Sequence, residues 1–254
     1  MSVAIIVGTG LGELLEGDNL ESVATAYGET LLWRHQDAGR TVFVLPRHGP
    51  GHRVPPHRIN YRANVSALKQ LGCRAAVATN AVGSLRTDLG VGSFALPDQF
   101  IDMTRQRAVT FYDGTDGQVV HTDVTDPYCP SLRQALRHGL ETHGVSVAEG
   151  VTYLCTEGPR FETPAEIRMF AQWGADLVGM TGVPEVVLAR EAGICYASVC
   201  VVTNLAAGLA TGPLNEQQIS ATASACFATL AGVLMEVVAS LPDPWPCRCA
   251  FSRG

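Results

Sequence analysis

The sequence predicts an α/β fold in which a central β-sheet carries helices on both faces. Short apolar segments, many of them β-branched, alternate along the chain with segments of helical periodicity. The chain has 254 residues, 46% of them hydrophobic and only 17% charged, so it is long enough to bury a large core. The sequence shows no linker, internal repeat or low-complexity block, which predicts a single domain over residues 1–254 with a short tail at residues 242–254.

Seven segments are expected to form strands because they are short, apolar and bounded by glycine or polar residues. They are residues 3–7, 41–45, 75–79, 94–103, 150–155, 177–180 and 197–203. Continuous apolar runs are typical of strands that are buried on both faces, which requires helices above and below the sheet.

Five segments are expected to form these helices. They are residues 59–71, 131–143, 164–173, 184–192 and 217–241. Pro130 and Pro184 mark two of the starts, because proline fits the first turn of a helix, where its missing N–H would have no partner. Thr163 followed by Glu166 predicts a capping box at a third start.

The last predicted helix also resembles a membrane span, because residues 217–235 carry no charge. Its apolar residues, however, recur at three- and four-residue steps, with Thr222, Thr229 and Glu236 elsewhere on the helical wheel. We therefore predict an amphipathic helix on the core and no membrane partner. The N-terminus lacks the basic segment of a signal peptide, which favours a cytoplasmic protein.

The charge and the cysteines narrow the class of protein further. A formal net charge of −6 argues against nucleic acid as a partner, because nucleic-acid binders usually present a basic patch. Most of the eight cysteines lie inside apolar runs, which predicts buried, reduced thiols. Cys247 and Cys249 differ because they lie in a polar, proline-rich tail, where oxidation or metal capture is an alternative to the free thiols that we favour.

A glycine-rich turn follows the first predicted strand at Gly8-Thr9-Gly10. Such a turn lets backbone N–H groups approach an anion, and the Thr9 hydroxyl among the glycines favours phosphate. The segment has neither the glycine spacing of a dinucleotide fingerprint nor the lysine of a P-loop. An ordinary tight turn is the alternative.

The densest positive cluster follows the second predicted strand, where three histidines and four arginines lie within residues 47–62 and no acid interrupts them. The planar fork of Arg47 suits a phosphate or carboxylate, and His48 can donate to the same anion. One alternative is a metal site of His48, His52 and His57, but no nearby cysteine or carboxylate completes a ligand set. The other alternative is a solvated loop.

Polar residues also close several of the other strands. Asn80 and Ala81 follow one strand, Met180 ends another and Thr181 follows it, and Asn204 closes the last. Ligands of open α/β sheets bind at the carboxyl ends of the strands, so this edge is the expected place for a site.

Phe161 and Glu162 stand just before the capped helix. Phe161 is placed to stack on a ring, and Glu162 to accept from a ring N–H. The alternative is purely structural, with Phe161 as a hydrophobic staple and Glu162 as a solvated acid of the first turn.

Together the segments reveal a family resemblance. In their order along the chain, the segments resemble motifs of the trimeric purine nucleoside phosphorylases, and most closely those of their methylthioadenosine/methylthioinosine phosphorylase branch. The segments are Gly8-Thr9-Gly10, Arg47-His48-Gly49, Asn80-Ala81-Val82-Gly83, Gly158-Pro159-Arg160-Phe161-Glu162-Thr163, Gly179-Met180-Thr181-Gly182 and Thr203-Asn204. The resemblance runs from residue 3 to about residue 241. It implies a nucleoside phosphorylase-like fold with a mixed sheet, a homotrimer, and phosphorolysis of a purine nucleoside with phosphate as co-substrate and no metal or other cofactor.

The resemblance also implies a role for each site residue. The phosphate ligands would be Thr9, Arg47, His48, Asn80, Ala81 and Thr181. The nucleoside ligands would be Phe161, Glu162, Met180, Asn204 and, lent by a neighbouring subunit to the 5′ end, His121. Among them Asn204, Glu162 and His48 would be catalytic.

Two residues favour a 6-oxopurine base. A Glu162 carboxylate accepts from the N1–H of hypoxanthine but faces the lone pair of adenine N1, and the Asn204 amide can donate to O6 or N7. Adenine-preferring members of the family carry aspartate in place of Asn204 and a small residue in place of Glu162. At the 5′ side, residues 209–241 contain no histidine, and Leu209 and Leu214 are apolar candidates for a methylthio contact.

The favoured substrate is therefore S-methyl-5′-thioinosine. The alternatives within the family are S-methyl-5′-thioadenosine phosphorylase and inosine/guanosine phosphorylase. Outside it stand a non-catalytic purine nucleoside binding protein and a nucleosidase that uses water.

Overall fold

The computed structural model describes residues 1–11, 15, 17, 19–37, 39–115, 117–210, 212–243, 245–247 and 249. The predicted tail at 242–254 therefore lies partly outside the described residues. The strands are β1 (Ser2–Val7), β2 (Leu20–Thr25), β3 (Gly28–Asp37), β4 (Arg40–Pro46), β5 (Cys73–Ser84), β6 (Phe94–Met103), β7 (Val147–Thr156), β8 (Leu177–Gly179) and β9 (Cys195–Leu205). The α-helices are α1 (Tyr61–Gln70), α2 (Pro130–Thr142), α3 (Pro164–Gln172), α4 (Gly182–Ala192) and α5 (Glu216–Ser240).

The strands form one mixed sheet in the order β2-β3-β4-β1-β5-β8-β7-β6-β9, which confirms the predicted fold class. All seven predicted strands and five predicted helices are present among the described residues. The sequence analysis missed the hairpin of β2 and β3, which pairs antiparallel with β4 at one edge of the sheet. Strand β2 alternates exposed and half-buried residues, so it has no apolar run to reveal it.

The far half of the sheet closes on itself, because β5 pairs with both β8 and β9. Strands β5 and β9 are parallel over most of their length, with a register shift between Val82 and Gly83. Beyond the shift, Gly83 lies close to Val178 and Asn204, and a Cβ at this glycine would approach the side chains of both to 3.2 Å. The absence of a side chain at position 83 thus leaves room where the strands converge.

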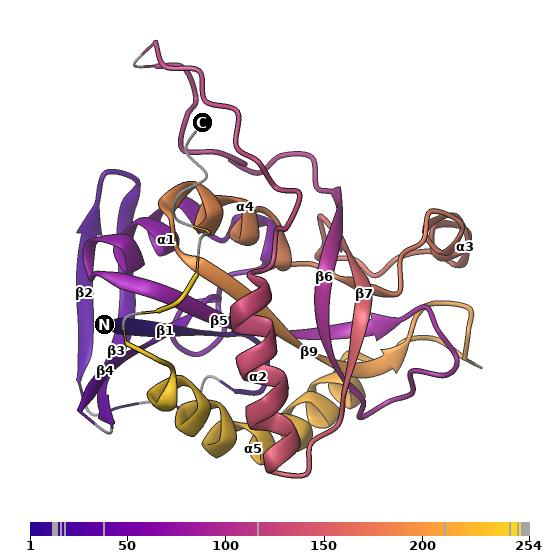
Figure 1. Ribbon diagram of the computed structural model, residues 1–254. Helices are drawn as coiled ribbons and strands as arrows, with labels where there is room; N and C mark the ends of the chain where they lie inside the picture. The colour runs from indigo at the N-terminus through magenta and orange to yellow at the C-terminus, as the bar shows by residue number, and fades with distance from the viewer. Residues whose placement is uncertain are drawn as a thin grey trace.

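The helices cover the two faces of the sheet. Helices α1 and α4 lie on one face, and α2 and α5 on the other (Figure 1). Strand β1 supplies both cores: Ala4 and Ile6 point to one, and Val3, Ile5 and Val7 to the other. This period of two, with residues 3–7 all buried, explains why that part of the strand is a continuous apolar run.

Helix α5 is long and apolar enough to cross a membrane by length and composition alone. Its residues Ala223, Phe227, Leu230 and Leu234 are nevertheless fully buried in the core that it shares with the sheet and α2. This stripe agrees with the predicted amphipathic packing.

Candidate active site

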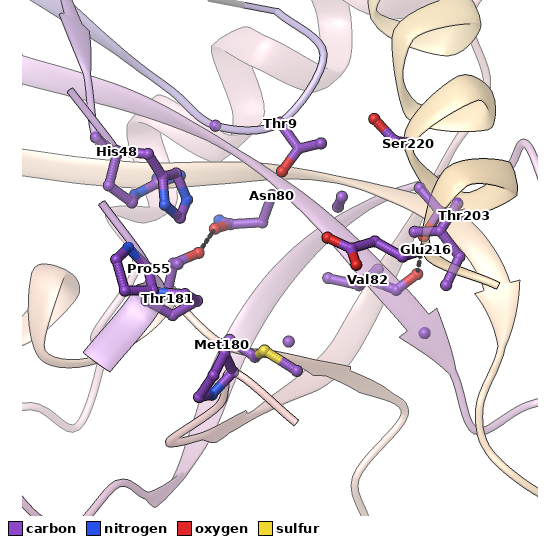
Figure 2. Close-up of a pocket in the computed structure, with 18 of the residues that line it drawn as sticks. Thr9, His48, Pro55, Asn80, Val82, Met180, Thr181, Thr203, Glu216 and Ser220 are labelled. Atoms are coloured by element: carbon purple, nitrogen blue, oxygen red, sulfur yellow. Dashed lines mark hydrogen bonds between the residues drawn. The ribbon is translucent and has the colours of Figure 1, made fainter. Parts of the chain in front are cut away.

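A pocket of about 490 Å³ opens at the carboxyl edge of the parallel strands β4, β1, β5 and β9. It gathers ten of the eleven predicted site residues. They are Thr9, Arg47, His48, Asn80, Ala81, Phe161, Glu162, Met180, Thr181 and Asn204. Figure 2 shows Thr9, His48, Asn80 and Thr181 around a common space, with Glu216 and Ser220 of α5 across from them.

Arg47 stands at the end of β4 and is 2% exposed. Its Nε and Nη2 donate to the two carboxylate oxygens of Glu185 at 2.7 and 2.8 Å, and its Nη1 donates to the carbonyl of Thr79 at 3.0 Å. Burial alone would lower the pKa of Arg47, but the charge of Glu185, the hydrogen bonds to its carboxylate and the nearby Tyr196 and Tyr61 together outweigh burial and raise that pKa. The guanidinium is therefore permanently charged and held in one orientation.

Glu185 is 0% exposed and also accepts from the hydroxyl of Tyr196 at 2.7 Å. The sequence analysis gave it no role, because the pair spans 138 positions. Gly8 completes the arrangement, since a Cβ there would come within 2.9 Å of Arg47 Nη1. The glycine turn therefore lies directly against the guanidinium, as an anion cradle requires.

His48 follows Arg47 and is 6% exposed. Burial, with the nearby charges of His52 and Arg47, lowers the pKa of His48 to about 3. The neutral ring directs Nδ1 at the carbonyl of Val54, 2.7 Å away, which assigns the proton to Nδ1 and leaves Nε2 as an acceptor. In this tautomer Nε2 can accept a hydrogen bond, whereas the sequence analysis expected His48 to donate one to an anion.

Asn80 and Thr181 meet in the centre of the pocket (Figure 2), where the Thr181 hydroxyl donates to Asn80 Oδ1 at 2.8 Å. Asn80 in turn donates from Nδ2 to the hydroxyl of Ser198 at 2.6 Å. Asn80 therefore helps to position Thr181, and the second N–H of its amide remains for a ligand. The Thr181 hydroxyl can rotate towards a bound anion.

Glu162 and Asn204 lie at the other end of the pocket. Glu162 is 9% exposed and accepts from the Thr156 hydroxyl at 2.7 Å. Burial raises the pKa of Glu162, although the bond from Thr156 opposes the shift. Asn204 accepts from the Thr203 hydroxyl at 2.9 Å and donates to the carbonyl of Leu205 at 2.9 Å, which fixes the orientation of its amide and leaves one N–H for a ligand.

Arg107 holds in place the backbone next to Glu162 and Met180. The sequence analysis missed this residue, because it assigned no conformation to the loop that contains it. Its guanidinium donates to the carbonyls of Met180 at 2.7 Å, Glu157 at 2.8 Å and Thr156 at 3.2 Å. One side chain thus ties together two segments that line the pocket. A lone arginine in a loop carries no pattern from which this role could be read.

His121, Leu209 and Leu214 do not line the pocket. His121 is exposed on the chain described here, and its role at a neighbouring subunit stays a prediction. Leu209 and Leu214 were expected near the 5′ side, but Leu209 is 40% exposed and neither leucine lines the pocket. Ile219, from the first turn of α5, is an apolar residue that does line the pocket.

Residues 2–239 match the model of the phosphorylase superfamily. The chain is 47% identical over 251 residues to a protein of Dictyoglomus turgidum named a probable 6-oxopurine nucleoside phosphorylase, with 98% of this chain and 95% of the relative covered. It is 50% identical over 217 residues to a protein of Methanocaldococcus jannaschii named a probable S-methyl-5′-thioinosine phosphorylase, with 85% of this chain and 84% of the relative covered.

Among solved structures, methylthioadenosine phosphorylase of Schistosoma mansoni in complex with adenine is similar, with a TM-score of 0.88 and 35% identity over 94% of this chain and 91% of that one. Together with the mixed sheet and the pocket at its carboxyl edge, these similarities define an enzyme of the nucleoside phosphorylase fold. The chain belongs to the phosphorylase superfamily.

Proposed function

We propose that the chain catalyses the phosphorolysis of a 5′-methylthio purine nucleoside, with S-methyl-5′-thioinosine preferred over S-methyl-5′-thioadenosine. The products would be the free purine and 5-methylthioribose 1-phosphate. The observation that carries the proposal is the single pocket that joins the anion cradle of Arg47, His48 and Thr181 to the polar pair Glu162 and Asn204.

At the anion end, phosphate would lie against Arg47, Thr9 and the backbone of Ala81, with Thr181 donating its hydroxyl. The neutral Nε2 of His48 would accept the proton of a hydrogen phosphate ion and so direct its charged oxygens towards the sugar. Breaking the C1′–N9 bond builds positive charge on the ribose, which the bound phosphate stabilises before it attacks C1′. Preoriented groups of this kind are each worth about 3 kcal/mol in the transition state.

At the base end, the leaving purine gains negative charge as the bond breaks. The remaining N–H of Asn204 would donate to N7 or O6, and Glu162 as a carboxylate would accept from N1–H of a 6-oxopurine. Phe161, which is 37% exposed at the pocket mouth, would cover the face of the base. The names of the relatives in Dictyoglomus and Methanocaldococcus agree with a 6-oxopurine.

At the sugar's 5′ end, Ile219 offers an apolar contact that suits a methylthio group better than a hydroxyl. Glu216 also lines the pocket, and near the 5′ end its charge would oppose a 5′-phosphate. His121 would reach the same place from a neighbouring subunit of a homotrimer. We further infer that the enzyme works in the cytoplasm on small molecules and needs no cofactor besides the co-substrate phosphate.

A second candidate is inosine/guanosine phosphorylase, favoured by the name of the Dictyoglomus relative. A substrate panel separates the two: kcat/KM is measured for S-methyl-5′-thioinosine, S-methyl-5′-thioadenosine and inosine, each with and without phosphate. We expect turnover only with phosphate and the highest value for S-methyl-5′-thioinosine. Activity without phosphate would contradict the roles of Arg47 and His48, and a preference of more than about tenfold (about 1.4 kcal/mol) for the adenine nucleoside would contradict those of Glu162 and Asn204.

A further inference from the structure

Four cysteines from three distant parts of the chain meet at one place outside the pocket. Cys129 caps the N-terminus of α2, Cys195 begins β9, and Cys247 and Cys249 lie in the tail that follows α5. The four Sγ atoms all lie within 4.8 Å of one another. Cys129 Sγ is 3.2 Å from Cys247 Sγ, which is 2.9 Å from Cys249 Sγ.

The surroundings of the sulfurs resemble those of a metal ligand set. The backbone N–H of Leu132 points at Cys129 Sγ at 3.4 Å, and that of Cys249 at Cys247 Sγ at 3.3 Å. Such N–H···S bonds orient thiolates and stabilise their charge in metal centres. Cys129 and Cys195 are 1% and 4% exposed, and the tail cysteines are half-buried, so little water competes for the site.

We propose that Cys129, Cys195, Cys247 and Cys249 bind one structural Zn²⁺ as four thiolates. Zinc takes sulfur ligands in tetrahedral geometry at about 2.3 Å, which places the sulfurs about 3.8 Å apart and within reach of the observed cluster. Each thiol that binds releases its proton to solvent, and no electron is transferred. A closed set of four protein ligands leaves no position for substrate, so this ion would have a structural role only.

Zinc accounts for the cluster better than a disulfide does. A disulfide between Cys247 and Cys249 would close a very small, strained ring. It would also not explain why the sulfurs of Cys129 and Cys195 lie beside those of the tail. One central ion uses all four sulfurs at once. It would fasten the tail to the start of both α2 and β9.

The site is remote from the pocket. Cys195 begins β9 and Asn204 lies at the opposite end of the same strand, nine residues away or about 30 Å in an extended chain. The proposal is therefore independent of the proposed function, and its test needs no substrate.

The full-length chain, purified under reducing conditions without chelator, is analysed for metal by native mass spectrometry and elemental analysis. Apo-protein is then titrated with Zn²⁺ against a coloured chelator, and with Co²⁺, whose tetrahedral thiolate complexes absorb strongly in the visible. We expect one tightly bound Zn²⁺ per chain, the Co²⁺ thiolate spectrum, and a lower thermal midpoint after chelation.

Cys247→Ser and Cys249→Ser change only the tail, so they spare the core and are expected to bind zinc at least about tenfold more weakly. Cys226→Ser is the matched control, because Cys226 is a half-buried cysteine of α5 outside the cluster and its variant should bind zinc normally. A reduced protein that retains no zinc overturns the proposal. So does a thiol count that shows these cysteines paired as disulfides in freshly isolated protein, or equal zinc binding by all three variants.

Discussion

Arg47 and Glu185 illustrate what a sequence does and does not disclose about single residues. The position and type of Arg47 predicted an anion site, because a basic residue at the end of a strand stands out in an acidic chain. Its fully buried carboxylate partner was not predictable, since only the fold brings the two residues together. The same holds for the protonation of His48, whose neutral state follows from burial that the sequence does not show.

Asn204 is the residue whose substitution should change the choice of base. In Asn204→Asp, the N–H donor to a 6-oxopurine is replaced by a carboxylate that accepts from the 6-amino group of adenine. We expect the ratio of kcat/KM for S-methyl-5′-thioinosine to that for S-methyl-5′-thioadenosine to fall by about tenfold or more, the effect of one hydrogen bond of about 1–3 kcal/mol. Glu162→Gln should move the ratio in the same direction, and an unchanged ratio in both variants would mean that the base lies elsewhere.

His48 should make the native state sensitive to acid. Its pKa is about 3 in the fold against 6.5 when exposed, so between these values the unfolded chain binds a proton that the native chain does not. Stability is then lost as the pH falls below about 6.5, by about 1.4 kcal/mol per pH unit. His48→Gln should weaken this dependence in urea unfolding without phosphate.

The exposed His143 is the control for this experiment. It pairs with Glu236, and bonds to the Gly139 carbonyl and to Glu236 raise the pKa of His143, so acidification does not destabilise the fold through it. His143→Gln should leave the acid-side loss of stability in place. An equal pH dependence in the wild type and His48→Gln would contradict the buried neutral state of His48.

At the scale of elements, the sequence predicts the helices and strands that have an apolar, periodic pattern. It misses the segments that become strand only by pairing with other strands. The capping box of Thr163 and Glu166 begins α3 as expected. Strand β5, by contrast, extends five residues beyond its predicted end. Four of them, Asn80, Ala81, Gly83 and Ser84, are polar or small, and the segment becomes strand by pairing with β8 and β9. The residues that bend the sheet into its closed half are thus also those that border the pocket.

The packing of α2 on α5 depends on one glycine. A Cβ at Gly139 would come within 2.3 Å of Val237 Cγ2, closer than any side chain tolerates. Gly139→Ala should therefore lower the free energy of unfolding by about 1–3 kcal/mol through overpacking. Gly232→Ala in α5 meets nothing within 4 Å and should instead be neutral or stabilising by up to about 1 kcal/mol. Urea unfolding of both variants checks the pair, and equal effects would contradict the contact.

At the scale of the whole molecule, several large apolar side chains lie exposed on the single chain. They are Leu20, Val91, Val109, Val119, Val120, Phe161, Trp173 and Leu209. Val119 and Val120 adjoin His121 on one loop, and Phe161 lies at the pocket mouth. If the loop of Val119 and Val120 packed against the pocket mouth of a neighbouring subunit, apolar surface would be buried on both sides. The same contact would bring His121 to the neighbour's pocket.

Subunit mixing tests this arrangement. His121→Ala should reduce kcat/KM by about tenfold, and Arg47→Ala should abolish activity, while both variants keep three times the chain mass in solution. In trimers assembled from both variants, some pockets receive an intact His121 and an intact Arg47. Activity above the sum of the two parents is expected, and its absence in confirmed mixed trimers would place His121 away from the neighbour's pocket.

The internal pairing of Arg47 with Glu185 bears on how fast the enzyme turns over. Because the carboxylate offsets the guanidinium and His48 is neutral, the cradle presents directed hydrogen bonds with little net positive charge. The sugar phosphate formed in the reaction is an anion like the phosphate that entered, and a strongly positive cradle would retain it. A nearly neutral one lets the product dissociate, so chemical bond cleavage rather than product release should limit the rate.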